Sequence, residues 1–418
     1  MSFQYSMILD PKPYIFCLSS IGFAVVCVII TNWIRARPMA STFDPAHPAH
    51  PAHPAHPAHP AHPTRQTHPP IHQPLLLPPH AHLTQVLGLM NNFISTSDTP
   101  SHTTIYCNTK KLIPGEDFGT PFGNLATVSV DDMFHGNNGQ VVKESIPFGI
   151  FIQTLTFKVM VSTLFNVDLA SFNPSDVDFI ITGINTLQNV SEFTTLHKNL
   201  IENLNNRLKR WLPNIGTTDP LDYIVPMYIT MSHVVAVGVV LLHDRADARE
   251  PLENYLGVPT STQFSHWLTA TPCPSVEAHL TESMRLYPPT KCIVRTISSL
   301  PHALFAILPK PLTQYFTRTI SVDIDAVHRD VSIWGGNANE FDAFRHRGDR
   351  ITERQRESLL HFGIGQSLCV ASKWAPEAAG LLIAAVVGRA GEEGDFWIEE
   401  GEEIGGRDGW EGWCIVPH

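Results

Sequence analysis

The chain has few charged residues and lacks a cysteine framework. Only 16% of its 418 residues are Asp, Glu, Lys or Arg, and the formal net charge is −11. This balance argues against a nucleic-acid binder, because neutralising phosphates requires clustered Lys and Arg. The seven cysteines are scattered and include no CxxC pair. We therefore expect free thiols in a cytosolic domain and no disulfide scaffold.

Apolar residues are plentiful, at 43% of the chain, which is enough for a large buried core. The length fits one large domain or two ordinary ones. From residue 84 onward the composition is ordinary, and we expect a globular domain over residues 84–418. Acidic residues gather between Glu392 and Glu403, where a solvated surface loop is the simplest interpretation.

Residues 14–34 form a long uncharged apolar run. At about 1.5 Å per residue, a helix of this length crosses a hydrocarbon core of about 30 Å. Arg35 and Arg37 follow the run directly, so the positive-inside bias places residues 1–13 in the lumen and the rest in the cytosol. We expect a single-pass anchor in the endoplasmic reticulum membrane. A cleaved signal peptide is the alternative, but its basic flank would precede the apolar run.

Residues 35–83 are rich in proline and histidine, and residues 45–62 are six copies of Pro-Ala-His. Proline at every third position favours polyproline II, so the segment predicts a disordered linker with a stiff spacer. A weak Zn²⁺ or Cu²⁺ chelator is the alternative. Neighbouring imidazoles would lie about 9 Å apart along such a rod, too far for one ion to bridge.

Two further apolar stretches, residues 148–164 and 223–243, predict long helices. The second is long enough to be another membrane span. Its His233 and His243, and the absence of basic residues near its start, favour a buried core helix instead.

Two short patches combine charge with helix and strand signals. Glu282 and Arg285 are three residues apart, so on a helix they share a face and can pair. Prolines 288 and 289 would end that helix. The second patch, residues 332–345, follows an alternating stretch at 320–327 that predicts a strand.

The third patch is a glycine-containing loop ahead of a cysteine, FGIGQSLCVA at residues 362–371. Its glycines allow a tight turn, and the apolar run at 378–387 predicts a following helix. A cysteine at a helix start meets the positive end of the helix dipole, which favours the thiolate. Cys369 is therefore a candidate metal ligand or nucleophile, although in isolation the pattern favours a buried structural cysteine.

The order and spacing of the three patches resemble the cytochrome P450 family, most clearly over residues 225–387. Glu282 and Arg285 match its ExxR helix, and Arg345 matches the second arginine of its charge network. Because a lone buried charge is costly, the three should be retained together as a structural unit. The resemblance implies a mainly α fold with a minor β part, preceded here by the single transmembrane helix.

The same resemblance implies a haem site. Phe362, Gly365 and Cys369 match the family's haem-loop signature, with Cys369 as the axial ligand of the iron. Arg295 matches a position that often contacts a haem propionate. Ser367 stands where the family usually has the Arg or His that contacts a propionate. A thiolate-ligated haem favours O–O cleavage and hydroxylation of C–H bonds.

Proton delivery is where the chain departs furthest from the family, whose long helix carries an acid or amide followed by threonine. Near that position lie only Thr230, Ser232 and His233, so Thr230 and Ser232 are the candidate catalytic hydroxyls. The N-terminal half is shorter than that of usual family members, and the family's Trp-x-x-x-Arg haem contact is missing from residues 84–418.

The function implied is O₂-dependent oxidation of a hydrophobic small molecule, such as a secondary metabolite, terpenoid or sterol-like compound. NADPH-cytochrome P450 reductase would supply electrons, membrane lipid would hold the substrate, and no nucleic acid would be bound. Fungal microsomal enzymes of secondary metabolism are the group that the chain most resembles. Two alternatives remain: a haem-thiolate isomerase or dehydratase that acts on a peroxide-type substrate, and a non-catalytic, degenerate relative.

Overall fold

The structure is a computed structural model that describes residues 107–134, 144–188, 195–212, 219–268, 272–298, 317–364, 368–391, 394–404 and 410–418. By its contacts the chain divides into Met1–Pro70 and Ile71–His418, and every described residue belongs to the second unit. The predicted anchor at residues 14–34 and linker at residues 35–83 lie outside the described residues.

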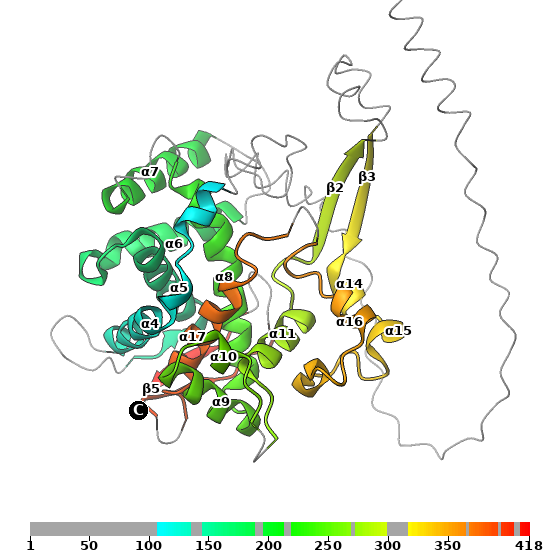
Figure 1. The fold of residues 1–418 in the computed structure, drawn as a ribbon. Coiled ribbons are helices and arrows are strands. Elements are labelled where there is room, and N and C mark those ends of the chain that lie inside the picture. Colours follow the sequence, from blue (N-terminus) through cyan, green and yellow to red (C-terminus); the bar gives the residue numbers. More distant parts are fainter. Residues whose placement is uncertain are drawn as a thin grey trace, which may run out of the picture. The chain divides into compact units, whose positions relative to one another are not determined.

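Helices dominate the described part of the chain (Figure 1). The long ones are α4 (Gly119–Phe134), α5 (Phe148–Phe165), α6 (Pro174–Gln188), α7 (Thr195–Trp211), α8 (Leu221–Leu242), α9 (Ala246–Gly257), α11 (Val276–Leu286) and α17 (Trp374–Val387). The short ones are α10 (Ser261–Phe264), α14 (Ile324–His328), α15 (Val331–Trp334), α16 (Glu353–Glu357) and the 3-10 turns η1 (Glu116–Phe118), η2 (Leu169–Ser171) and η4 (Ala343–His346).

The strands form two small antiparallel sheets. One has the order β1-β5-β4, from β1 (Ile146–Pro147), β5 (Cys414–Pro417) and β4 (Phe396–Glu399). The other is a hairpin of β2 (Cys292–Ser298) and β3 (Thr317–Asp323), in which Arg295 is paired with Ile320. The predicted mainly α fold with a minor β part is confirmed for these residues.

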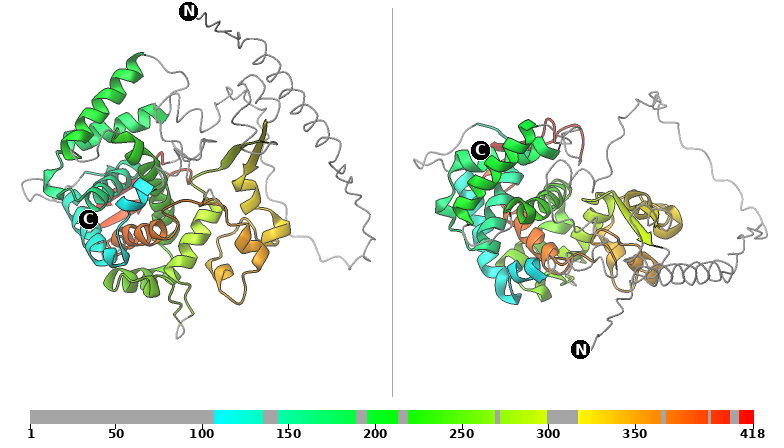
Figure 2. Two further views of the ribbon diagram at one scale, coloured as in Figure 1. Left: turned by 45° about the horizontal axis from the view of Figure 1, so that its top comes forward. Right: turned by 90° about the horizontal axis from the view of Figure 1, so that it is seen from above.

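The main core lies among α4, α5, α8 and α17, where α17 packs against α4 and α8, and α5 packs against the same two helices. The helices α8 and α17 are apolar nearly all round, and a helix of that kind is stable only when it is enclosed. They approach closely at Gly238, where a Cβ atom would overlap the buried Ile383 side chain. Helix α11 packs against both, and the hairpin with α14, α15 and α16 lies beyond it (Figures 1 and 2).

Two helices of the described part, α5 and α8, are long and apolar enough to cross a membrane by length and composition. In each, most of the apolar window is buried inside the protein, 61% in α5 and 67% in α8. This burial fits the expectation that residues 223–243 form a core helix.

The strand predicted over residues 320–327 ends early, at Asp323. The Asp323 carboxylate accepts a hydrogen bond from the Ala326 amide at 3.0 Å and so caps α14. This capping overrides the alternating pattern, because aspartate favours helix N-termini over strand interiors. The prediction was therefore wrong for residues 324–327.

Candidate functional site

Helix α11 places Glu282 and Arg285 on one buried face. The helix starts at a cap in which the Ser275 side chain accepts a hydrogen bond from Ala278. It ends at Leu286, just ahead of the two prolines that were expected to stop it. Both charged side chains have no exposed surface, so each needs partners within the protein.

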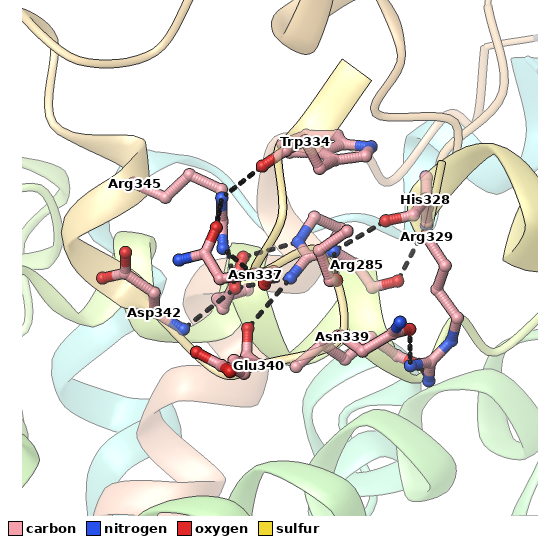
Figure 3. Close-up of polar contacts among 12 residues, drawn as sticks. Arg285, His328, Arg329, Trp334, Asn337, Asn339, Glu340, Asp342 and Arg345 are labelled. Carbon is pink, nitrogen blue, oxygen red and sulfur yellow. Dashed lines mark hydrogen bonds and ion pairs between the residues drawn. The ribbon is translucent and has the colours of Figure 1, made fainter. Parts of the chain in front are cut away.

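Arg285 donates through all three of its guanidinium nitrogens (Figure 3). Its Nε and Nη2 form a fork on the Glu282 carboxylate at 2.8 and 2.7 Å. Its Nη1 donates to the carbonyl oxygens of His328 at 2.6 Å and Ala338 at 2.7 Å. Nη2 also donates to the Glu340 carbonyl oxygen at 3.3 Å. One side chain of α11 thereby fixes the backbone of residues 328–340.

The Glu282 carboxylate also contacts groups outside α11. His346 Nε2 lies 2.8 Å from one carboxylate oxygen, and the Asp342 amide donates to the other at 3.0 Å. Burial alone would raise the pKa of Glu282, but hydrogen bonds from Arg285 and His346 outweigh it and lower the pKa to about 2. The carboxylate is therefore charged across the physiological pH range.

Arg345, the predicted second arginine, is buried beside this pair. Its Nε lies 3.5 Å from Glu282 Oε1, while its Nη1 and Nη2 donate to the carbonyl oxygens of Trp334 at 2.9 Å and Asn337 at 3.1 Å. The structure thus brings together the three charges singled out from the sequence. It adds His346, whose only sequence signal was its place directly after Arg345.

The cysteine loop is closed by a backbone hydrogen bond. The Cys369 amide donates to the Phe362 carbonyl oxygen at 2.8 Å. Gly363 has φ = +73°, a conformation that favours glycine, and its amide donates to the Leu360 carbonyl oxygen at 2.9 Å. Gly365 and Ser367 lie outside the described residues.

Cys369 was expected at a helix start, but it lies in a turn that precedes α17, which begins at Trp374. The helix dipole therefore acts on it less directly than predicted. Desolvation raises the pKa of the thiol, whereas a hydrogen bond from the Ala371 amide lowers it, and the net shift is upward. Without a cation at the sulfur, the thiol form is favoured near neutral pH.

The loop fits a flat apolar group that carries a metal. Cys369 is an exposed residue, although neighbouring groups partly desolvate its sulfur, and beside it Ile364 and Leu368 are 65% and 48% exposed although both are large and apolar. A metal at Sγ would displace the thiol proton, and the Ala371 N–H would stabilise the resulting thiolate. Haem ligated by Cys369 would supply the metal and would cover the apolar neighbours.

Three predicted site residues remain, the two candidate catalytic hydroxyls and Arg295. Thr230 is exposed on α8, and its hydroxyl donates to the Pro226 carbonyl oxygen at 2.9 Å. The buried Ser232 hydroxyl donates to the Ile229 carbonyl oxygen at 3.2 Å. Both hydroxyls are thus engaged by their own helix. Arg295 lies in β2, and its side chain is outside the described part of the structure.

Part of the chain is similar in sequence to plant cytochromes P450. It is 30% identical over 112 residues to cytochrome P450 734A5 of Oryza sativa subsp. japonica and 30% identical over 136 residues to cytokinin hydroxylase of Arabidopsis thaliana. These matches cover 26% and 32% of this chain, and the chain spans only 20% and 23% of the length of these two relatives. No family model matches the chain.

Solved structures with this fold are similar over most of the chain. Retinoic acid-bound cyanobacterial CYP120A1 has a TM-score of 0.58 at 16% identity, covering 80% of this chain and 82% of its own. A six-coordinated cytochrome P450 from Thermus thermophilus has a TM-score of 0.55 at 14% identity, covering 81% and 85%. The chain therefore has the cytochrome P450 fold, and part of its sequence is similar to plant cytochromes P450.

Proposed function

We propose that the chain is a haem-thiolate monooxygenase that oxidises a hydrophobic small molecule, with Cys369 as the axial ligand of the iron. The observation that carries the proposal is the loop at Cys369, closed on Phe362 within a cytochrome P450 fold. Bound haem would supply activation of O₂. One plant relative is a hydroxylase by name, which is consistent with this reaction class.

The protein's own residues would prepare the site. Glu282, Arg285 and Arg345 hold residues 328–345 against α11. The Ala371 amide stabilises negative charge on the Cys369 sulfur. We further propose that Phe362 and Gly365 shape the loop around the cofactor and that Arg295 and Ser367 contact its propionates.

We propose the same organisation along the chain that the sequence predicts. Residues 1–13 would be lumenal, residues 14–34 would anchor the chain in the endoplasmic reticulum membrane, and residues 35–83 would link the anchor to a cytosolic domain over residues 84–418. NADPH-cytochrome P450 reductase would be the electron donor. Substrates that partition into lipid, including terpenoid or sterol-like secondary metabolites of the fungal microsomal type, suit such an anchor.

A second candidate is a haem-thiolate isomerase or dehydratase that acts on a peroxide-type substrate. The Thr230 and Ser232 hydroxyls both donate within α8, and the helix has a single acidic residue, Asp222, eight positions before Thr230. A peroxide substrate already contains the O–O bond and does not require protons to be delivered to O₂. The same geometry argues against Thr230 and Ser232 as a proton relay.

The reduced carbon-monoxide difference spectrum of the full chain in membranes tests the shared part of both proposals. We expect a red-shifted Soret band of the thiolate type, and we expect Cys369→Ala to abolish it. Cys292→Ala is the matched control, because Cys292 belongs to strand β2 and not to the cysteine loop, and it should leave the band unchanged. Well-expressed protein that retains no haem would contradict the assignment.

Turnover separates the two reactions. Consumption of NADPH with reductase and a lipophilic substrate supports the monooxygenase. Conversion of a lipid hydroperoxide without NADPH, in a preparation that is inactive with reductase, supports the isomerase. Haem retention with neither activity supports a non-catalytic relative.

A further inference from the structure

A buried histidine joins the ExxR helix to the segment that leads into the cysteine loop. His328 is the last residue of α14 and has no exposed surface. Its Nδ1 lies 3.0 Å from the Arg285 carbonyl oxygen, and the Leu360 amide donates to its Nε2 at 3.0 Å. A carbonyl oxygen can only accept and an amide N–H can only donate, so the proton is on Nδ1 and the ring is neutral.

The two hydrogen bonds of His328 connect α11 to the segment that leads to Cys369. Leu360 is two residues before Phe362, whose carbonyl oxygen accepts from the Cys369 amide at 2.8 Å. On the other side, Arg285 both accepts from the His328 ring and donates to the His328 carbonyl oxygen at 2.6 Å. The base of the loop is therefore held to α11 through one imidazole.

The surroundings of His328 oppose a second proton. The net pKa of His328 is lowered to about 4, chiefly by burial. The Arg285 guanidinium also lowers the pKa, while the Arg285 and Ser358 carbonyl oxygens and the Asp325 carboxylate raise it. The His361 ring lies edge-on to the His328 ring, with the ring centroids 6.0 Å apart. Burial lowers the pKa of His361 to about 3. A proton on Nε2 would turn that atom from acceptor to donor and break its bond with Leu360.

We propose that His328 is a positioning residue for Cys369, which holds the base of the cysteine loop through the Leu360 amide and releases it when its ring takes a second proton. The role assigned to Cys369 rests on the proposed function. The hydrogen bond from Leu360 to His328 joins two protein atoms, so it can be tested separately.

The test compares three variants of the full chain with the wild type in detergent. His328→Gln keeps an acceptor and a donor but cannot titrate, and His328→Phe removes both. His266→Gln is the control, because His266 is exposed in the turn after α10. Circular dichroism at each pH checks that the variants keep their helices.

In cofactor-free protein the readouts are hydrogen exchange of residues 358–364 and the alkylation rate of Cys369. In wild type we expect protection from exchange, relative to the intrinsic rate at each pH, to fall with a midpoint near pH 4, and His328→Gln to lack this midpoint. We expect His328→Phe to exchange roughly tenfold faster at pH 7 than wild type, as expected for one lost hydrogen bond. Cys369 alkylation at a fixed pH near 7 should be faster in His328→Phe in the same proportion.

In haem-loaded protein the thiolate Soret band of His328→Phe should weaken at pH 7, while that of His328→Gln should persist to lower pH than in wild type. Exchange and alkylation that do not depend on residue 328 would overturn the inference, whether or not haem binds. Absence of haem from a protein that shows the expected exchange would overturn the proposed function and leave the loop mechanism standing.

Discussion

At the scale of single residues, Arg285 determines how the site is assembled. It makes two hydrogen bonds to Glu282 and three to backbone carbonyl oxygens, with no exposed surface. Only a planar guanidinium can serve acceptors in these directions, since an ammonium group has three donors at one point. The charge network of Glu282, Arg285 and Arg345 was expected from the sequence, whereas the backbone contacts of Arg285 depend on where residues 328–340 lie.

Arg285→Lys should therefore destabilise the protein although it keeps the charge. We expect the free energy of unfolding to fall by about 3 kcal/mol, because buried carbonyl oxygens and part of the Glu282 carboxylate lose their donors. Arg356→Lys is the control, because Arg356 is exposed and makes one long hydrogen bond to Gly348. Urea unfolding followed by circular dichroism measures both. Equal stability of the two variants would show that charge alone is sufficient.

At the scale of elements, the close approach of α8 and α17 determines the core. Gly238 on α8 faces Ile383 on α17, and both helices are otherwise lined with buried aliphatic side chains. Apolar periodicity predicted both helices. It could not show which residue of α8 would meet α17, because that depends on the crossing point of two elements well separated in sequence.

Gly238→Ala should strain this contact, since the added methyl group overlaps a buried isoleucine. We expect a loss of about 1–3 kcal/mol, the usual cost of overpacking a core. Gly257→Ala, at the end of α9, has nothing within 4 Å of the new Cβ and serves as the control. The midpoint of urea unfolding should be clearly lower for G238A than for G257A. A G238A midpoint at or above that of G257A would contradict the close packing of Gly238 against Ile383.

At the scale of the whole molecule, buried histidines couple stability to acidity. The folded protein holds His328 and His361 neutral, with pKa values of about 4 and about 3, whereas in the unfolded chain they titrate near 6.5. Below pH 6.5 the unfolded state therefore binds protons that the folded state does not. Stability is complete above about pH 6.5 and falls as the pH drops toward the folded pKa values.

We expect the free energy of unfolding to decrease between pH 6 and pH 4.5, with a slope that approaches about 1.4 kcal/mol per pH unit for each histidine. His328→Gln should reduce the slope by about 1.4 kcal/mol per pH unit, which is the contribution of one histidine. Urea titrations at several pH values give it directly. A slope unchanged by H328Q would mean that His328 takes up its proton equally in both states.

The amino-acid sequence alone was enough to predict what depends on near neighbours: the helix that carries Glu282 and Arg285, its stop at the prolines, the turn before Cys369 and the apolar helices. These follow from hydrogen bonds, caps and periodicity within a few residues. Tertiary packing was needed to show that His346 reaches Glu282, that His328 connects Arg285 to Leu360, and that the strand after residue 317 ends at Asp323. The two histidine contacts join residues tens of positions apart, so they form only once α11, the hairpin and the cysteine loop have packed together.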